Sequence, residues 1–207
     1  MTVNRVAHWD TVYASRGPTE VSWFQREPHL TLHLLELLGI DPDATVIDIG
    51  GGASTLVDRL AGRGFRDLTV LDISAAALDL ARARIGAEAP VHWLPADVLT
   101  WDPDRAYDLW HDRAVFHFMV DPTERDAYLS TLGRAVPDGS VILATFAPDG
   151  PDSCSGLPVA RYSPAELADL LGGFEIVEAG RDVHITPAGA TQPFTFVAAR
   201  RIGHTDA

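Results

Sequence analysis

Lysine is absent from this 207-residue sequence, whose 16 basic residues are all arginine. Mechanisms that need a lysine nucleophile or a lysine Schiff base are therefore excluded. Cysteine is nearly absent as well: Cys154 stands alone, so no internal disulfide can form and a reducing compartment is expected. No apolar run is long enough to span a bilayer, and Met1–Arg5 lacks an apolar secretory signal. We expect a cytoplasmic protein that makes no membrane contact.

Positive charge is scarce. The formal net charge is -13 at pH 7, which argues against nucleic-acid binding because phosphate contacts need a basic face. Hydrophobic residues make up 46% of the chain and charged residues 22%, which is ordinary for a globular protein. The length fits one domain with a sizeable core.

From residue 44 onward, apolar runs typical of strands alternate with helical patterns, which predicts βαβ units and a parallel sheet. Strands are expected at 45–49, 68–72, 91–95, 107–111, 140–146, 174–179 and 194–199, and helices at 54–62, 74–85, 122–135 and 164–171. Ser163-Pro164-Ala165-Glu166 has the pattern of a capping box, and Asp121-Pro122 starts a helix in a similar way. The pattern predicts an α/β fold, a single doubly wound, Rossmann-like domain with a seven-stranded, mostly parallel sheet.

Two segments lie outside this regular alternation. Residues 1–43 precede the core of residues 44–202, and helices are expected there at 7–15 and 27–38. Residues 147–161, rich in Gly, Pro and Ser, form an insertion after the fifth strand. In an open α/β sheet such a loop lies at the carboxyl ends of the strands, where ligands bind, so it is either a lid or an inert surface loop.

The strongest functional signal is the run Val46-Ile47-Asp48-Ile49-Gly50-Gly51-Gly52-Ala53-Ser54. A buried strand ends in a glycine-rich turn, and a helix begins immediately after it. Glycine lets the backbone approach a ligand closely and adopt positive φ without steric cost. The run therefore predicts a nucleotide-type cofactor site that includes Asp48, Gly50, Gly51, Gly52 and Ser54.

Two details favour S-adenosylmethionine (SAM) over a dinucleotide. Thr55 occupies the third glycine position of the dinucleotide fingerprint. Asp48, where the strand enters the turn, would repel a pyrophosphate. SAM carries an ammonium and a sulfonium group and no phosphate, so an acid is favourable there. The alternative is that Asp48 only stabilises the turn.

Two further acids follow the next strands. Asp72 ends the second strand about 20 residues beyond the glycine turn, where a carboxylate can accept hydrogen bonds from both ribose hydroxyls. Asp97 follows the third strand and can accept from the exocyclic amine of adenine, with Ile73 and Val98 beside the ring. The alternatives are a helix cap at Asp72 and a plain loop residue at Asp97.

Asp48-x-Gly50-x-Gly52, Asp72 and Asp97, each at a strand end, resemble class I SAM-dependent methyltransferases along the whole chain. That resemblance implies an antiparallel last strand. His8-Trp9-Asp10-x-x-Tyr13 and Glu20-Val21-Ser22-Trp23-Phe24-Gln25 resemble a branch with lysine methyltransferases that act on elongation factor and citrate synthase, together with uncharacterised bacterial relatives. The resemblance implies that residues 1–43 cover the cofactor and that Trp23 and Gln25 help to enclose it. The alternative for the aromatic residues is ordinary packing against the sheet.

The chemistry is expected after the fourth strand. Methyl transfer needs proximity, alignment and a dry pocket, with a base only when the nucleophile arrives protonated. His111 is the candidate base or orienting group, Arg113 the candidate partner for a carboxylate or phosphate, and His117 a third candidate. Arg113 could instead pair with Asp108 or Asp112. The spacing of His111, Asp112 and His117 matches no metal motif, so no metal is expected.

The Asn-Pro-Pro-Tyr motif of amide and nucleobase methyltransferases is absent from 107–118, which weakens both of those acceptors. The leading hypothesis is a small-molecule acceptor, because little chain remains for a docking surface. A protein lysine is the alternative, supported by the N-terminal resemblance. Two further alternatives are a nucleotide-dependent oxidoreductase, which Asp48 and Thr55 oppose, and a non-catalytic SAM-binding protein.

Overall fold

The computed structural model describes residues 4–15, 17 and 19–203, which are built around a mixed β-sheet. Its strands are β1 (Thr45–Ile49), β2 (Asp67–Asp72), β3 (Val91–Pro95), β4 (Leu109–Arg113), β5 (Ser140–Phe146), β8 (Phe174–Ile185) and β9 (Thr191–Arg201). They lie in the order β3-β2-β1-β4-β5-β9-β8. Strands β1 to β5 pair in parallel, and β9 is antiparallel to both of its neighbours. The predicted Rossmann-like fold with an antiparallel last strand is confirmed.

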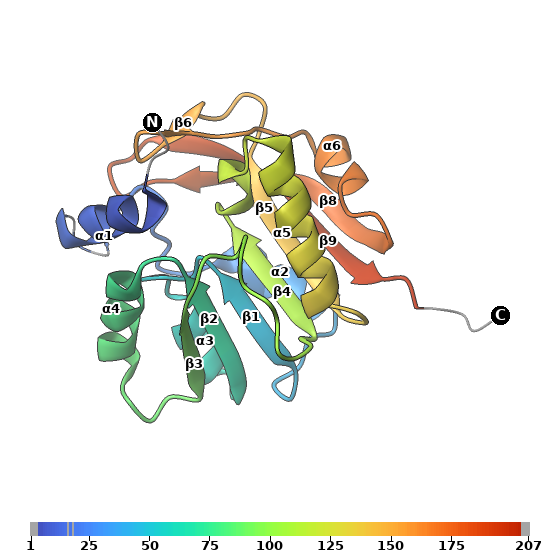
Figure 1. Cartoon of the computed structure of the whole chain (residues 1–207), viewed down its shortest axis with the longest axis horizontal. Helices are drawn as coiled ribbons and strands as arrows, with labels where there is room; N and C mark the ends of the chain where they lie inside the picture. Colours follow the sequence, from blue (N-terminus) through green and yellow to red (C-terminus); the bar gives the residue numbers. More distant parts are fainter. Residues whose placement is uncertain (1–3, 16, 18, 204–207) are drawn as a thin grey trace.

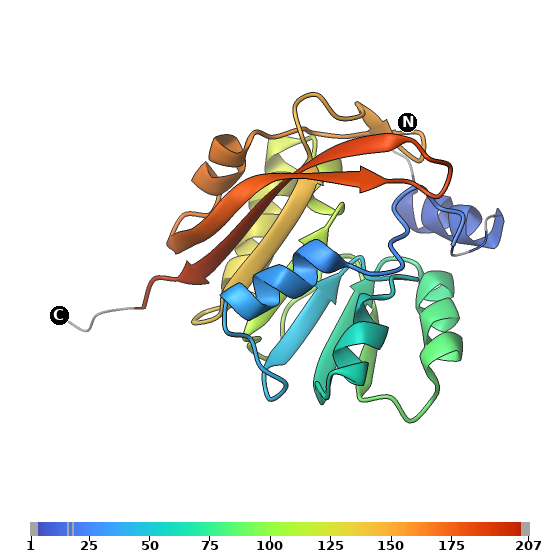
Figure 2. The same cartoon turned by 180° about the vertical axis from the view of Figure 1, so that it is seen from behind.

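Helices cover both faces of the sheet. They are α1 (Arg5–Ser15), α2 (His29–Leu37), α3 (Leu56–Gly62), α4 (Ala75–Ile85), α5 (Pro122–Ala135) and α6 (Pro164–Asp169), with the 3-10 turn η1 (Phe116–Phe118). Helix α5 lies in front of the sheet in Figure 1, whereas α2 and α3 lie on the opposite face, seen in Figure 2. Helix α1 contacts α4, where Ser74 Oγ donates a hydrogen bond of 2.6 Å to Asp10.

Local sequence sets the helix starts. At α6, Ser163 Oγ accepts from the Glu166 amide at 3.3 Å and the Glu166 carboxylate accepts from the Ser163 amide at 2.8 Å. This is the predicted capping box. At α5, Asp121 accepts from the Thr123 amide at 2.8 Å, which satisfies a backbone donor that the helix leaves free.

The core lies between the sheet and its helices. Every residue of β5 is buried, because a parallel strand covered on both faces needs an apolar run rather than an alternating one. On the α5 side, Trp110 Nε1 donates to the Tyr128 hydroxyl at 2.9 Å, and both side chains are 0% exposed. Burying each such side chain contributes roughly 1.5–3 kcal/mol.

The bounds of β4 differ from the expected 107–111. Asp108 anchors the chain just before the strand: its amide donates to the Thr45 carbonyl at 2.9 Å, and its carboxylate accepts from the Thr45 amide at 2.7 Å. The ladder therefore begins at Leu109 and extends to Arg113. Strands β8 and β9 are longer than expected and form one hairpin. Residues 147–161 contain a small hairpin, β6 (Ser153–Cys154) and β7 (Leu157–Pro158).

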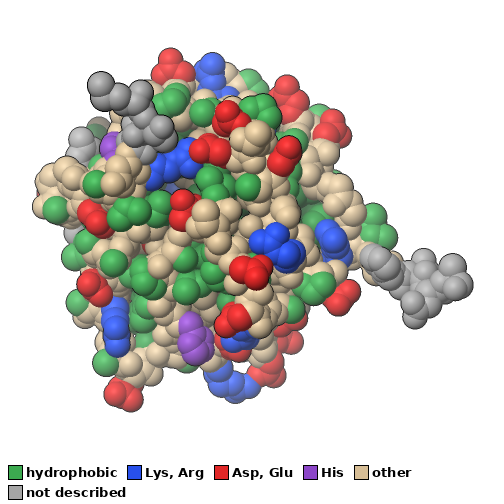
Figure 3. Space-filling view, in the orientation of Figure 1, with side chains coloured by type: hydrophobic (Ala, Val, Ile, Leu, Met, Phe, Trp, Pro, Cys, Tyr) green, Lys and Arg blue, Asp and Glu red, His purple; other side chains and the backbone are tan. Residues whose placement is uncertain are grey.

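On the face shown in Figure 3, the arginine side chains lie apart from one another among acidic and apolar ones. Several are paired with carboxylates, as Arg105 is with Asp67 at 2.6 Å and Arg134 with Asp102 at 3.3 Å. Among the helices of residues 4–15, 17 and 19–203, none has both the length and the apolar character needed to cross a bilayer.

Candidate functional site

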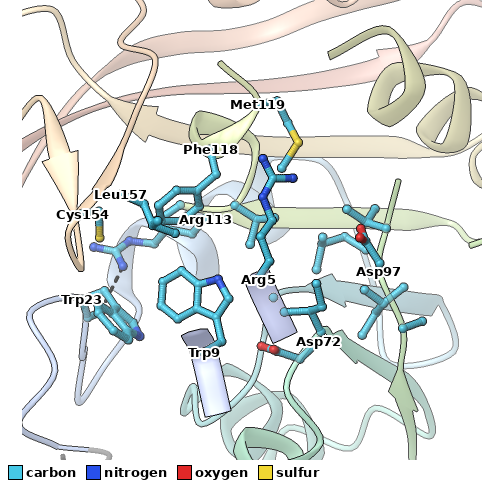
Figure 4. A pocket seen from close by; sticks show the side chains of 18 of the residues that line it. Arg5, Trp9, Trp23, Asp72, Asp97, Arg113, Phe118, Met119, Cys154 and Leu157 are labelled. Carbon is cyan, nitrogen blue, oxygen red and sulfur yellow. Dashed lines mark hydrogen bonds between the residues drawn. The ribbon is translucent and has the colours of Figure 1, made fainter. Parts of the chain in front are cut away.

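Two connected hollows lie at the carboxyl ends of the parallel strands. The larger, here called the aromatic cleft, encloses about 820 Å³ including its mouth, which is in the range of small-molecule sites. The smaller, here called the glycine-turn pocket, encloses about 580 Å³. Trp23, Ile49, Gly50 and Arg113 line both. Figure 4 shows the cleft, with Asp72 and Asp97 on one side, Arg113 and Cys154 on the other, and Trp9 between them.

The glycine turn after β1 is as close-fitting as its sequence predicts. Gly50 and Gly52 have φ values of 64° and 36°, which side chains rarely adopt. A Cβ on Gly51 would lie 2.5 Å from Asp48 Oδ2, and a Cβ on Gly52 would lie 2.6 Å from Asp72 Oδ2. The turn therefore brings bare backbone against two carboxylates and leaves room for a ligand above it.

Asp72 lies at the end of β2, is 6% exposed, and lines the aromatic cleft. Its Oδ1 accepts from the Ser74 amide at 2.8 Å, while Ser74 Oγ caps α4 by accepting from the Ala77 amide at 3.2 Å. Burial raises the pKa of Asp72 to about 7, and the charges of Asp48 and Asp10 add to the rise. The alternative reading of Asp72 as a turn-stabilising residue is thus partly correct.

The next strand supplies the neighbouring wall. Ile73, Asp97 and Val98 all line the aromatic cleft, as expected from the sequence. Asp97 Oδ1 accepts from the Leu99 amide at 2.9 Å, which holds the loop after β3. Its other carboxylate oxygen forms no hydrogen bond with the described residues and remains free to accept from a ligand.

Asp48 belongs to a buried hydrogen-bonded chain. Its Oδ1 lies 2.6 Å from His111 Nδ1, and His111 Nε2 lies 3.0 Å from Thr31 Oγ1 on α2. The register explains the first contact, because Asp48 is directly opposite His111 in the β1–β4 ladder. Asp48 Oδ2 is buried and has no hydrogen-bond partner among the described residues. The Asp48 side chain therefore offers one free oxygen in the glycine-turn pocket.

The prediction that His111 acts as a base does not fit this geometry. The residue is 5% exposed and lines only the glycine-turn pocket. Both ring nitrogens are already engaged, so taking a proton from an acceptor would break one of two buried hydrogen bonds. His111 instead holds Asp48 in position.

The prediction of a catalytic His117 is wrong. The side chain is 0% exposed and packs against Phe118 and Phe146, with ring centroids 4.4 Å and 4.8 Å away. It lines neither hollow. Burial, followed by the charge of Arg113, lowers the pKa of His117 to about 3. A neutral ring in the core cannot exchange protons with a ligand.

Arg113, at the end of β4, does reach the cleft. Its Nη1 donates to the Trp23 carbonyl at 3.1 Å, and its guanidinium carbon lies 4.4 Å from the ring centroid of Phe194 on β9. Neither of the predicted pairings, with Asp108 or Asp112, is present. Asp112 points to the other face, where it accepts from the amides of Val115 and Phe116 at 2.9 Å and 3.0 Å.

The N-terminal segment forms the aromatic wall. Trp9 and Tyr13 of α1 surround Trp23, with centroid separations of 5.8 Å and 6.1 Å, and Trp9 also contacts Phe118 at 5.3 Å. Gln25 lines the glycine-turn pocket, and its carbonyl accepts from Thr55 Oγ1 at 2.7 Å.

Ser54 lines the same pocket and accepts from the Leu56 amide at 3.1 Å, at the start of α3. Among the described residues, no group of three or more His, Cys, Asp or Glu side chains is arranged to hold a metal ion.

Several lining residues were not predicted. Thr31 and Phe194 complete the surroundings of His111 and Arg113, and Cys154 and Leu157 bring the β6–β7 hairpin into the wall of the cleft. Phe194 had a usable signal: it begins an antiparallel strand, and such a strand starts at the edge where the parallel strands end. Thr31 had none, because α2 is remote from β4 in sequence.

The strand order, the glycine turn and the acids at consecutive strand ends define a Rossmann-like methyltransferase fold. Residues 46–139 match the family model described as a methyltransferase domain. The chain is 33% identical to EEF1A lysine methyltransferase 2 of Danio rerio over 156 residues, 67% of this chain and 66% of that protein. This chain belongs to the class I SAM-dependent methyltransferases.

Two further similarities bear on the fold and on the extent of the match. An uncharacterized methyltransferase of Mycobacterium tuberculosis is 35% identical over 102 residues, which cover 49% of this chain and only 50% of that relative. The structure of Burkholderia thailandensis 1,6-didemethyltoxoflavin-N1-methyltransferase, with bound 1,6-didemethyltoxoflavin and S-adenosylhomocysteine, has a TM-score of 0.68 at 21% identity and covers 96% of this chain and 84% of that one. At that identity the similarity shows the fold alone.

Proposed function

We propose that this chain is an enzyme that transfers the methyl group of SAM to a small-molecule acceptor. The observation that carries the proposal is the convergence of the glycine turn, Asp48, Asp72 and Asp97 on two connected hollows. The cofactor would lie along the carboxyl edge of the sheet. Adenine would lie beside Asp97, Ile73 and Val98, and the ribose would lie beside Asp72.

The residues present fit SAM. Asp48 Oδ2 is a buried acceptor without a partner, and a Cβ at Gly51 or Gly52 would fill the space beside the carboxylates. The raised pKa of Asp72 reports mutual repulsion with Asp48 and Asp10 in addition to burial. A cation relieves such repulsion, whereas a pyrophosphate would add to it. This supports SAM over a dinucleotide.

When bound, SAM supplies a methyl group on a sulfonium whose thioether is a good leaving group. The chain's own residues then have three tasks: to bind, to align and to exclude water. Trp9, Trp23 and Phe118 would shield the reacting atoms, and the described part of residues 1–43 would act as the cover of the site. Because His111 is engaged on both sides, the acceptor's nucleophile would arrive already deprotonated or lose its proton to solvent.

A small-molecule acceptor is favoured by the walls of the cleft. Away from Asp72 and Asp97 the lining is aromatic or aliphatic, with Arg113 as its charged group. A protonated lysine side chain would meet a cation there rather than an acid. The small-molecule substrate in the toxoflavin methyltransferase complex supports the same choice. The similarity to EEF1A lysine methyltransferase 2 supports a protein lysine as the second candidate.

Labelled SAM tests both levels of the proposal. Calorimetry with S-adenosylhomocysteine and with NAD decides the cofactor, and binding of NAD alone would refute it. Transfer of tritium from labelled SAM into a fractionated lysate, sorted by product size, decides the acceptor. Label in small products is expected, and label confined to protein would favour the lysine alternative. Cofactor binding without label in any fraction would indicate a non-catalytic SAM-binding protein.

A further inference from the structure

Arg113 is a buried cation without an ion-pair partner. No carboxylate among the described residues lies within ion-pair distance of it, although Asp182 and Cys154 act on it from further away. Nη1 is held by the Trp23 carbonyl and the guanidinium is stacked on Phe194, so the group cannot swing out to water. Nη2 is buried and has no hydrogen-bond partner in the described structure. A buried charge of this kind is normally paired, so its anion is expected from a ligand.

Asp48 presents the complementary case in the same pocket. One carboxylate oxygen is used by His111, and Oδ2 is buried without a partner among the described residues. Because His111 fixes the carboxylate from behind, Oδ2 is held in one direction. It calls for a hydrogen-bond donor, and best of all for a cationic one.

The two groups lie on one face of the sheet, at a suitable separation. Asp48 is opposite His111 in the β1–β4 ladder, and Arg113 is two residues further along β4, so its side chain projects to the same face as His111. A strand spacing of 4.8 Å and a rise of 3.3 Å per residue put the two Cα atoms roughly 8 Å apart. Both residues line the glycine-turn pocket.

We propose that Asp48 and Arg113 form a clamp for the α-amino-acid end of the cofactor. The cofactor's ammonium donates to Asp48 Oδ2, and its carboxylate accepts from Arg113 Nη2. Only a ligand that carries both charges on one carbon satisfies both buried groups at once. An anionic acceptor would answer Arg113 alone and a lysine side chain Asp48 alone. The clamp rests on the proposed function, and it assigns Arg113 to the cofactor rather than to the acceptor.

The test compares three ligands by calorimetry: S-adenosylhomocysteine, its decarboxylated analogue, and methylthioadenosine, which lacks the whole amino-acid end. Arg113→Gln removes the charge, and Arg134→Gln, on α5 and away from both hollows, is the matched control. Arg113→Gln is expected to weaken S-adenosylhomocysteine roughly 10- to 100-fold, the worth of a charged hydrogen bond. It should change the other two ligands by less than about twofold, and Arg134→Gln should leave all three within that range.

The wild-type protein gives an independent measurement if Arg113→Gln does not fold. There the decarboxylated analogue should bind roughly 10- to 100-fold more weakly than S-adenosylhomocysteine. The clamp is refuted if the two ligands bind equally, or if the variant weakens all three ligands alike. A variant with normal S-adenosylhomocysteine affinity and a raised KM for the acceptor would also refute it, by assigning the anion to the acceptor. If the wild type binds none of the three, the proposed function itself fails.

Discussion

Asp72 should make cofactor affinity depend on pH. Burial, with added repulsion from Asp48 and Asp10, raises its pKa to about 7, against an opposing hydrogen bond from the Ser74 amide. Ribose hydroxyls donate hydrogen bonds, so the ionised carboxylate is the form that accepts from both of them. Ligand binding should therefore lower the pKa of Asp72 and release a proton.

The size of the effect follows from that pKa. Affinity falls as the free protein takes up the proton that the complex excludes, so binding should be roughly 10-fold weaker at pH 6 than at pH 8. Calorimetry with S-adenosylhomocysteine in two buffers of different ionisation enthalpy measures both the affinity and the proton count. At pH 7, about half a proton should leave per ligand bound.

Asp72→Asn is the matched control, since it keeps the shape of the side chain and cannot ionise. Its affinity should be lower and should no longer depend on pH through this residue. Equal wild-type affinities at pH 6 and pH 8, or the same slope in the Asn variant, would refute the reasoning. The unliganded protein gives the opposite sign: because the folded pKa is raised, the stability this group contributes is lost as pH rises toward and through about 7. Asp72→Asn should therefore melt higher than wild type at pH 8.

His111→Ala should lower the unfolding free energy by about 1–3 kcal/mol and weaken S-adenosylhomocysteine, because it leaves Asp48 unsupported; lost turnover with intact binding would restore a base role. His117→Phe should remove an acid destabilisation of about 2 kcal/mol between pH 7 and pH 5. The unfolded histidine takes up a proton there and the folded one, with its pKa lowered to about 3, does not; equal urea-denaturation losses in both proteins would contradict this. Gly51→Ala should weaken S-adenosylhomocysteine at least ~10-fold, since its Cβ would lie 2.5 Å from Asp48 Oδ2; unchanged calorimetric affinity would show that the turn tolerates a side chain.

The parallel half of the sheet could be predicted because its strands are apolar runs between turn signals. The acids at the ends of β1 and β2 followed from the same pattern, since strand ends of a parallel sheet share one edge. The shift of β4 could not be predicted. It depends on Asp108 reaching the backbone of Thr45 on another strand, and residue spacing carries no such information.

The histidines show where sequence reasoning stopped. His111 lies at the right strand end, but its role depends on two neighbours, Asp48 across the ladder and Thr31 on α2. His117 follows β4 as closely as a functional residue would, yet the turn after the strand directs it into the core. In both cases the side-chain direction decided the role. That direction was set by tertiary packing that no local pattern encodes.

The position of β9 has a consequence for how the protein is made. This strand is the last of the sheet in sequence, but it lies between β5 and β8 and supplies the ring on which Arg113 stacks. A nascent chain that has passed the glycine turn, and even β5, still lacks that ring and the edge it completes. Ligand binding during synthesis must therefore wait until residues 191–201 have left the ribosome. Before then, the exposed edge of β5 is the surface that chaperones would meet.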